Sequence, residues 1–157
     1  GFGALPRMDT AFYNLFVITS ESVDSSNGFS VPKEQALQDT DEDIVSALTM
    51  LGELELTAIR SYPTIVATKN HGCGTTNSWH RASYGFLNDI VVRDNTILFC
   101  FSKLNDISQQ VLISNASNLC IGKASAFNEF DRPHWSVKRL NIIKALKSVG
   151  VIVTVLT

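Results

Sequence analysis

Short apolar segments rich in β-branched and aromatic residues recur along the sequence, and they constrain the fold more than any other feature. Residues 11–19 form one such segment. Residues 90–93 and 96–101 form two more, joined by Asp94-Asn95, two residues that tolerate the left-handed backbone of a hairpin turn. The same pattern predicts short strands at residues 64–68, 111–114, 119–121 and 151–156. This succession of strands favours a protein built around a β-sheet.

Two stretches of the sequence have the periodicity of amphipathic helices. The first is predicted to begin with Thr40 as its N-cap and to end at Gly52, although it can continue through Ile59. The second is predicted to begin after Ser136 and to end at Gly150. This second helix and the strand after it can also close a parallel α/β unit. Together the elements predict an α+β fold: a single domain with a mostly antiparallel or mixed sheet and two principal helices packed on it.

The length and composition favour one globular domain over residues 1–157. A chain of this length can bury a self-sufficient core, and its 45% apolar and 18% charged residues exclude a disordered chain. Residues 20–39 are rich in Ser, Asp, Asn, Gly and Gln and are predicted to form a surface arm or a long loop. No segment has the 18 or more apolar residues of a transmembrane helix, so we expect a soluble chain with no membrane partner.

The charges are divided unequally along the chain. Ten acidic and two basic residues occur up to Glu55, whereas five acidic and eleven basic residues follow from Leu56 onward. Such an asymmetry suits a self-complementary contact, either within one molecule or between copies, and the basic part can also meet RNA. We therefore expect a binding or assembly module that contacts other protein chains or itself through the polar arm and complementary charged surfaces. The alternative is that both sets of charges are dispersed and solvated.

The polar segment of residues 69–81 has the highest density of chemically capable side chains. His71 and His80 can serve as general base and general acid, since imidazoles titrate near neutral pH. Lys69 and Arg81 can hold a phosphate and stabilise a developing anion. The second functional hypothesis is therefore a small metal-independent hydrolase, with RNA as the expected substrate, that is, a ribonuclease. A structural loop with hydrogen-bonded histidines is the alternative interpretation.

A third arrangement pairs Cys73 as a thiol nucleophile with His134 as its base, which predicts a cysteine hydrolase. His71, Cys73 and His80 are also zinc-compatible ligands, but their spacing fits no zinc motif, so no metal site is predicted. The sequence has no phosphate-binding glycine loop and no G-x-S-x-G turn, and no cofactor is predicted.

Overall fold

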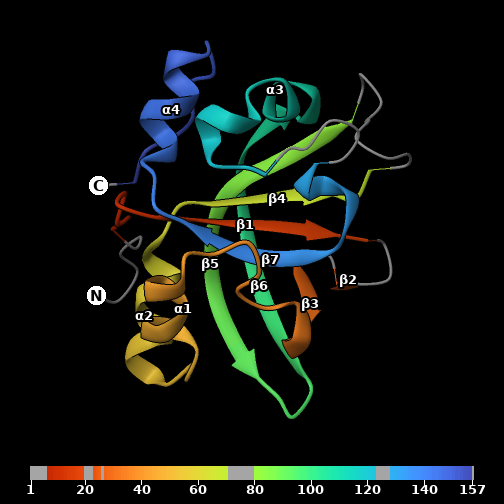
Figure 1. Cartoon of the computed structure of the whole chain (residues 1–157), viewed down its shortest axis with the longest axis vertical. Coiled ribbons are helices and arrows are strands. Elements are labelled where there is room, and N and C mark those ends of the chain that lie inside the picture. The colour runs from red at the N-terminus through yellow and green to blue at the C-terminus, as the bar shows by residue number, and fades with distance from the viewer. Residues whose placement is uncertain (1–6, 20–22, 26, 71–79, 123–127, 157) are drawn as a thin grey trace.

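The computed structural model describes residues 7–19, 23–25, 27–70, 80–122 and 128–156, and it contains strands, short helices and 3-10 turns (Figure 1). The strands are β1 (Tyr13–Ile18), β2 (Val23–Ser25), β3 (Gly28–Pro32), β4 (Thr64–Thr68), β5 (Arg81–Val92), β6 (Thr96–Ser108) and β7 (His134–Lys138). The α-helices are α1 (Glu42–Leu48), α2 (Glu53–Ser61), α3 (Gln109–Ser114) and α4 (Ile142–Ser148). The 3-10 turns are η2 (Lys33–Gln35), η3 (Ala116–Leu119) and η4 (Glu129–Asp131).

The seven strands form one mixed sheet in the order β2-β3-β6-β5-β4-β1-β7. The pair β1–β4 is parallel, and every other pair is antiparallel. The long β5–β6 hairpin has two register irregularities, after Tyr84 and after Leu87. The predicted α+β fold class with a mixed sheet is confirmed.

Each face of the sheet carries a hydrophobic core covered by helices. In β1, Tyr13, Leu15 and Val17 belong to the core beneath α3, η3 and α4, whereas Phe16 belongs to the core beneath α1 and α2. The ring of Phe16 packs edge-on against Phe99, with 4.6 Å between the ring centroids. Figure 1 shows α3 and α4 on one side of β1 and β4, and α1 and α2 on the other. The two faces arise because successive side chains of a strand point in opposite directions.

Between residues 20 and 39 the structure differs from the predicted arm, because this segment contains β2, β3 and η2. Phe29 and Val31 are buried and β3 pairs with β6 along its whole length. Strand β3 has only five residues, and this is too short for an alternation of apolar and polar residues to be recognised within the polar sequence around it.

The first predicted helix is divided into α1 and α2. Leu51 has a φ of 50°, a left-handed backbone conformation that a helix cannot contain, and Gly52 then precedes α2. Thr40 is not the N-cap, since Asp41 holds that position and the Thr40 hydroxyl donates to the carbonyl oxygen of Gln38.

The helix predicted after Ser136 is wrong in its first part, because residues 134–138 form the buried strand β7. The helix begins later: Asn141 caps α4 by accepting a hydrogen bond from the backbone N–H of Lys144. Pro133 disfavours helical backbone at the residue before it, which agrees with an extended chain at this point.

The strands predicted at residues 111–114 and 119–121 are also wrong, because α3 and η3 occupy this region. Residues 151–156 have no strand partner either. They are held by single hydrogen bonds, for example from the Tyr84 hydroxyl to the carbonyl oxygen of Thr154 at 3.0 Å. Apolar side chains are buried in both regions, and this produced the apolar pattern that predicted strands. Burial alone does not distinguish a strand from a helix or an irregular segment.

Candidate functional site

Three of the predicted catalytic residues lie at one end of the sheet: Lys69, His80 and Arg81. Lys69 directly follows β4, Arg81 begins β5, and both side chains are exposed. Gln109 links the two strands, because its backbone N–H donates to the carbonyl oxygen of His80 and its side chain donates to the carbonyl oxygen of Thr68. His71 and Cys73 lie outside the described residues, so the proposed pairs His71–His80 and Cys73–His134 stay predictions.

His134 lies in β7 and belongs to a buried polar group. Alternation along this strand places His134, Ser136 and Lys138 on one face, opposite Val17, Leu15 and Tyr13 of β1. The other face carries Trp135 and Val137, which join the core beneath α1 and α2. A strand buried on both faces therefore presents three polar side chains to a single region of the interior.

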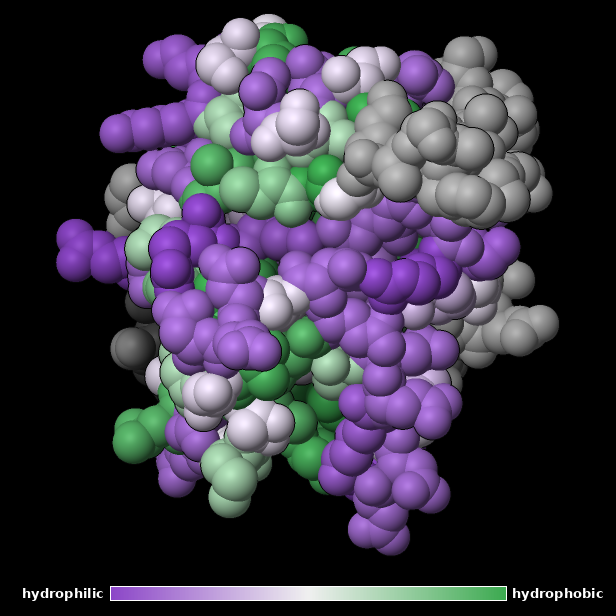
Figure 2. All heavy atoms as spheres, viewed as in Figure 1, coloured by the Kyte–Doolittle hydropathy of each residue, from purple (hydrophilic) through white to green (hydrophobic). Residues whose placement is uncertain are grey.

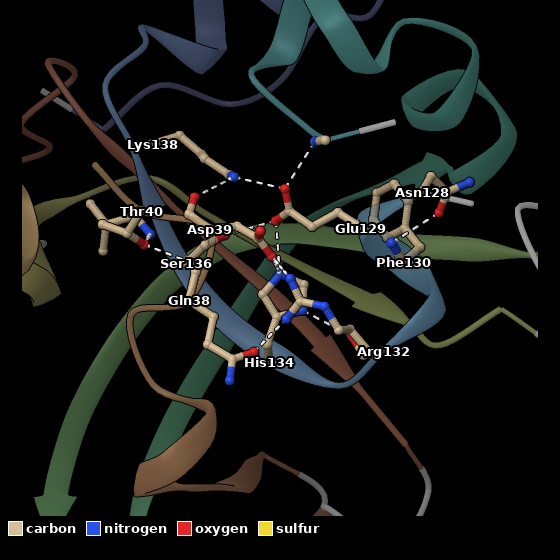
Figure 3. Close-up of polar contacts among 12 residues, drawn as sticks. Gln38, Asp39, Thr40, Asn128, Glu129, Phe130, Arg132, His134, Ser136 and Lys138 are labelled. Carbon is tan, nitrogen blue, oxygen red and sulfur yellow. Dashed lines mark hydrogen bonds and ion pairs between the residues drawn. The ribbon is translucent and has the colours of Figure 1, made fainter. Parts of the chain in front are cut away.

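Glu129 is the common partner of these side chains (Figure 3). Its Oε1 accepts from Lys138 Nζ at 2.8 Å and from the backbone N–H of Gly122 at 2.9 Å. Its Oε2 accepts from His134 Nε2 at 2.8 Å and from Ser136 Oγ at 3.1 Å. Four donors thus satisfy a carboxylate that is 5% exposed.

Local structure brings Glu129 to this position. Asn128 caps the turn η4, since its Oδ1 accepts from the backbone N–H of Phe130, while Asp131 Oδ2 accepts from the backbone N–H of Asn128. Asn70, directly after β4 and Lys69, donates through Nδ2 to Asn128 Oδ1 at 3.0 Å and to Asp131 Oδ1 at 2.9 Å. The turn is therefore fixed to the sheet end that carries Lys69.

The charge of Glu129 is stabilised by its neighbours. Burial by itself raises the pKa of this carboxyl, but the hydrogen bond from His134 and the charge of Lys138 outweigh burial and lower the pKa to about 2. The same carboxylate contributes, after burial, to a pKa of Tyr13 well above its usual value. Glu129 is consequently ionised throughout the neutral pH range.

A second carboxylate closes the exposed side of the group. Asp39 forms an ion pair with Arg132, and its Oδ2 lies 3.5 Å from His134 Nε2. Its carbonyl oxygen accepts from Lys138 Nζ at 2.8 Å. Gln38 donates its backbone N–H to the carbonyl oxygen of Trp135, so this segment covers the outer edge of β7. We call Asp39, Glu129, Arg132, His134, Ser136 and Lys138 the ion cluster.

The ion cluster is better suited to structural stability than to catalysis. Asp39, Glu129 and His134 each place one possible metal-ligand atom within 4.8 Å of the others. However, the charges of Lys138 and Arg132 already balance the two carboxylates. Both ring nitrogens of His134 already lie within hydrogen-bond distance of oxygen atoms, Glu129 Oε2 and the Arg132 carbonyl oxygen at 2.9 Å, so neither points to a position open to a substrate.

A different surface is exposed at the corner between α1 and α2. Met50 and Leu54 are 81% and 83% exposed. Figure 2 shows hydrophobic side chains among polar ones at its lower left, where Figure 1 places these helices. The carboxylates of this part of the chain are Asp41, Glu42, Asp43, Glu53 and Glu55. We call Met50, Leu54 and these five carboxylates the helical corner.

A surface of opposite charge surrounds the end of α4. Lys144 and Lys147 are exposed on this helix, whereas Ile142 and Leu146 are buried. After Gly150, whose φ of 86° turns the chain, Ile152 and Val155 are 72% and 47% exposed. We call Lys144, Lys147, Ile152 and Val155 the α4 surface.

Part of the charge asymmetry is satisfied inside the molecule. Asp39 pairs with Arg132, and Asp43 pairs with Arg139, so acidic residues of the first part contact basic residues of the second. Within the described ranges, no ion pair involves the remaining carboxylates of the helical corner or the lysines of the α4 surface.

Comparison of this chain with protein-family models, with curated proteins and with solved structures gives no match. None of the helices in the described ranges has the length and apolar composition needed to cross a membrane. Function therefore has to be inferred from the geometry of the chain itself.

Sequence reasoning named His134 but missed its partners. The alternation His-Trp-Ser-Val-Lys over residues 134–138 is a signal for a strand with a polar and an apolar face. The preceding Asn-Glu-Phe-Asp, residues 128–131, has the polar residues of a capped turn. No local signal indicates that Asp39 closes the cluster, since its partners Arg132 and Lys138 lie 93 and 99 positions later in the chain.

Proposed function

We propose that this chain is a protein-interaction module and that the helical corner docks a basic, partly apolar segment of another chain. The observation that carries the proposal is the exposure of Met50 and Leu54, both above 80%. Full burial of one such side chain contributes about 1.5–3 kcal/mol, so two neighbouring anchors supply a useful part of a binding free energy.

The charges around these anchors support a basic partner. Glu42 and Glu53 are exposed in the first turns of α1 and α2, and neither forms an ion pair in the described part of the chain. Exposed carboxylates around an apolar centre attract a cationic segment and disfavour an acidic one. The conformation of Leu51, with its φ of 50°, fixes the turn that separates Met50 from Leu54.

The test is a titration of the protein with two fluorescent synthetic peptides. One is an amphipathic peptide of lysine and leucine, and the other has glutamate in place of lysine. We expect the lysine peptide to bind and the double variant Met50→Ser/Leu54→Ser to bind it at least tenfold more weakly. We expect no binding of the glutamate peptide, because like charges repel.

The matched control is Val91→Ser/Val92→Ser, which removes another exposed apolar pair, at the end of β5. Val91 and Val92 are less exposed than Met50 and Leu54, at 39% and 37%, so circular dichroism is used to establish that both double variants are folded before binding is compared. Equal loss of binding in both variants, or no loss in either, would exclude the helical corner as the docking surface.

A further inference from the structure

We infer that the partner of the helical corner is a second copy of this chain, which presents its α4 surface. This inference rests on the proposed function and names its partner. The helical corner is acidic around two exposed apolar side chains, and the α4 surface is basic around two others, Ile152 and Val155. One surface therefore has the chemistry that the other requires.

The exposed hydrophobic side chains are concentrated on these two surfaces. In the described part of the chain the large exposed hydrophobics are Met50, Leu54, Val91, Val92, Ile152 and Val155. Four of these six belong to the helical corner or the α4 surface. Single exposed apolar residues are common on protein surfaces and need no explanation. Here, however, one apolar pair has acidic neighbours and the other has basic neighbours, so the two surfaces are complementary in the way that the two sides of an interface are.

The lysines of the α4 surface are held in place for such a contact. Asn141 and the buried Ile142 and Leu146 fix α4 on the core, and this leaves Lys144 and Lys147 on its outer side. The backbone N–H of Val151 donates to the carbonyl oxygen of Leu146 at 2.9 Å, which turns the following segment back beside the helix end. Ile152 and Val155 are exposed in this segment, and each is followed by a buried residue, Val153 and Leu156.

The arrangement of the two surfaces excludes their meeting within one molecule. Figure 1 shows α4 at the top and α1 and α2 in the lower part of the molecule, and the four apolar side chains of the two surfaces all stay exposed in the folded chain. The contact must therefore join different copies. Because it uses two different surfaces, it is heterologous and leaves one surface free at each end, so copies add one after another.

The expected result is association that grows with concentration and passes beyond a dimer in sedimentation velocity. Salt should weaken it, since charges at an exposed contact are screened over about 8–10 Å. Removing one apolar anchor with Leu54→Ser should weaken self-association at least tenfold. The control Arg93→Glu reverses an exposed charge on the β5–β6 hairpin and should leave association unchanged.

The decisive experiment reverses the two charged surfaces separately. One variant carries Glu42→Lys/Glu53→Lys, and the other carries Lys144→Glu/Lys147→Glu. In the first variant two new lysines offset the remaining unpaired carboxylates, Asp41 and Glu55, so the helical corner no longer attracts the basic α4 surface. In the second variant both surfaces are acidic, so neither variant should associate alone. An equimolar mixture restores opposite charges between the copies, and its association should return to within about tenfold of the wild-type protein.

Each alternative outcome overturns a defined statement. If the wild-type chain stays monomeric while the lysine peptide binds the helical corner, the second copy is not the partner and the proposed function stands. If neither association nor peptide binding occurs, both proposals fail. The last case is a wild-type chain that associates while either reversed variant associates equally well, or while the mixture of variants does not regain association. In that case the α4 surface is not the surface that binds the helical corner.

Discussion

Replacing Glu129 by Gln tests the ion cluster most directly. Glutamine has nearly the same shape, but its amide NH₂ takes the place of one acceptor oxygen. That NH₂ then faces either Lys138 Nζ and the Gly122 N–H, or His134 Nε2 and Ser136 Oγ, all of which donate to Glu129. A buried cation also loses its counter-charge, and breaking such a pair costs about 3–5 kcal/mol. We expect Glu129→Gln to lose this much free energy of unfolding at pH 7.

The pKa of Glu129 leads to a similar magnitude independently. The folded protein lowers the pKa of this carboxyl from 4.5 to about 2, and each unit corresponds to about 1.4 kcal/mol, so ionisation contributes roughly 3 kcal/mol. The contribution is complete above about pH 5, where both states are ionised. As the pH falls from 4.5 to 2, the unfolded chain takes up a proton that the folded chain does not, and this stability is lost.

The assay is urea unfolding of the wild-type protein and Glu129→Gln between pH 2 and pH 7, followed by circular dichroism. The difference between the two unfolding free energies should narrow steadily below pH 5. Asp106→Asn is the control, because Asp106 pairs with Lys103 where both side chains are more than half exposed. Such surface pairs contribute about 0–1 kcal/mol. A loss below about 1 kcal/mol in Glu129→Gln, independent of pH, would refute this account of the cluster.

Two other predictions concern stability and ionisation elsewhere in the sheet. Gly85→Ala should destabilise the protein by about 3 kcal/mol or more in urea unfolding, since the added Cβ would lie 1.9 Å from the Ser102 carbonyl oxygen in the neighbouring strand. Gly122→Ala, whose Cβ meets nothing closer than 3.6 Å, is the matched control, and equal losses in the two variants would contradict the reasoning. Burial raises the pKa of all three tyrosines, to about 12 for Tyr84, so absorbance at 295 nm should increase at a higher pH in the folded protein than in the urea-unfolded protein. Because the unfolded tyrosines ionise first, stability should fall as the pH rises above 10, and an ordinary titration near pH 10 in the folded state would exclude the burial.

The elements that the sequence predicted well are those in which local preference and burial agree. Residues 11–19 and 64–68 are rich in β-branched and aromatic residues and became the interior strands β1 and β4. The hairpin around Asp94-Asn95 also formed, although β5 and β6 are much longer than the apolar runs that indicated them. Pairing with each other extends these strands through polar residues that local pattern alone does not assign.

The missed elements depend on distant contacts. Residues 109–114 contain Val111 and Ile113, which favour strands, yet they form α3. Gln109 at its start is fully buried and bonds to both backbone groups of Thr68, 41 positions earlier. Such a contact is specified by tertiary structure and overrides the intrinsic preference of the helix residues.

The charge asymmetry could be predicted from the sequence, but its division between two uses could not. Asp39 and Asp43 meet Arg132 and Arg139 inside one molecule and hold the outer edge of β7. Four members of the ion cluster, Glu129, His134, Ser136 and Lys138, are buried, so salt screens their contacts little, whereas an exposed contact at the helical corner is screened strongly. Some of the acidic residues are therefore already paired within the fold, and the remaining unpaired carboxylates are the ones available to bind a basic partner.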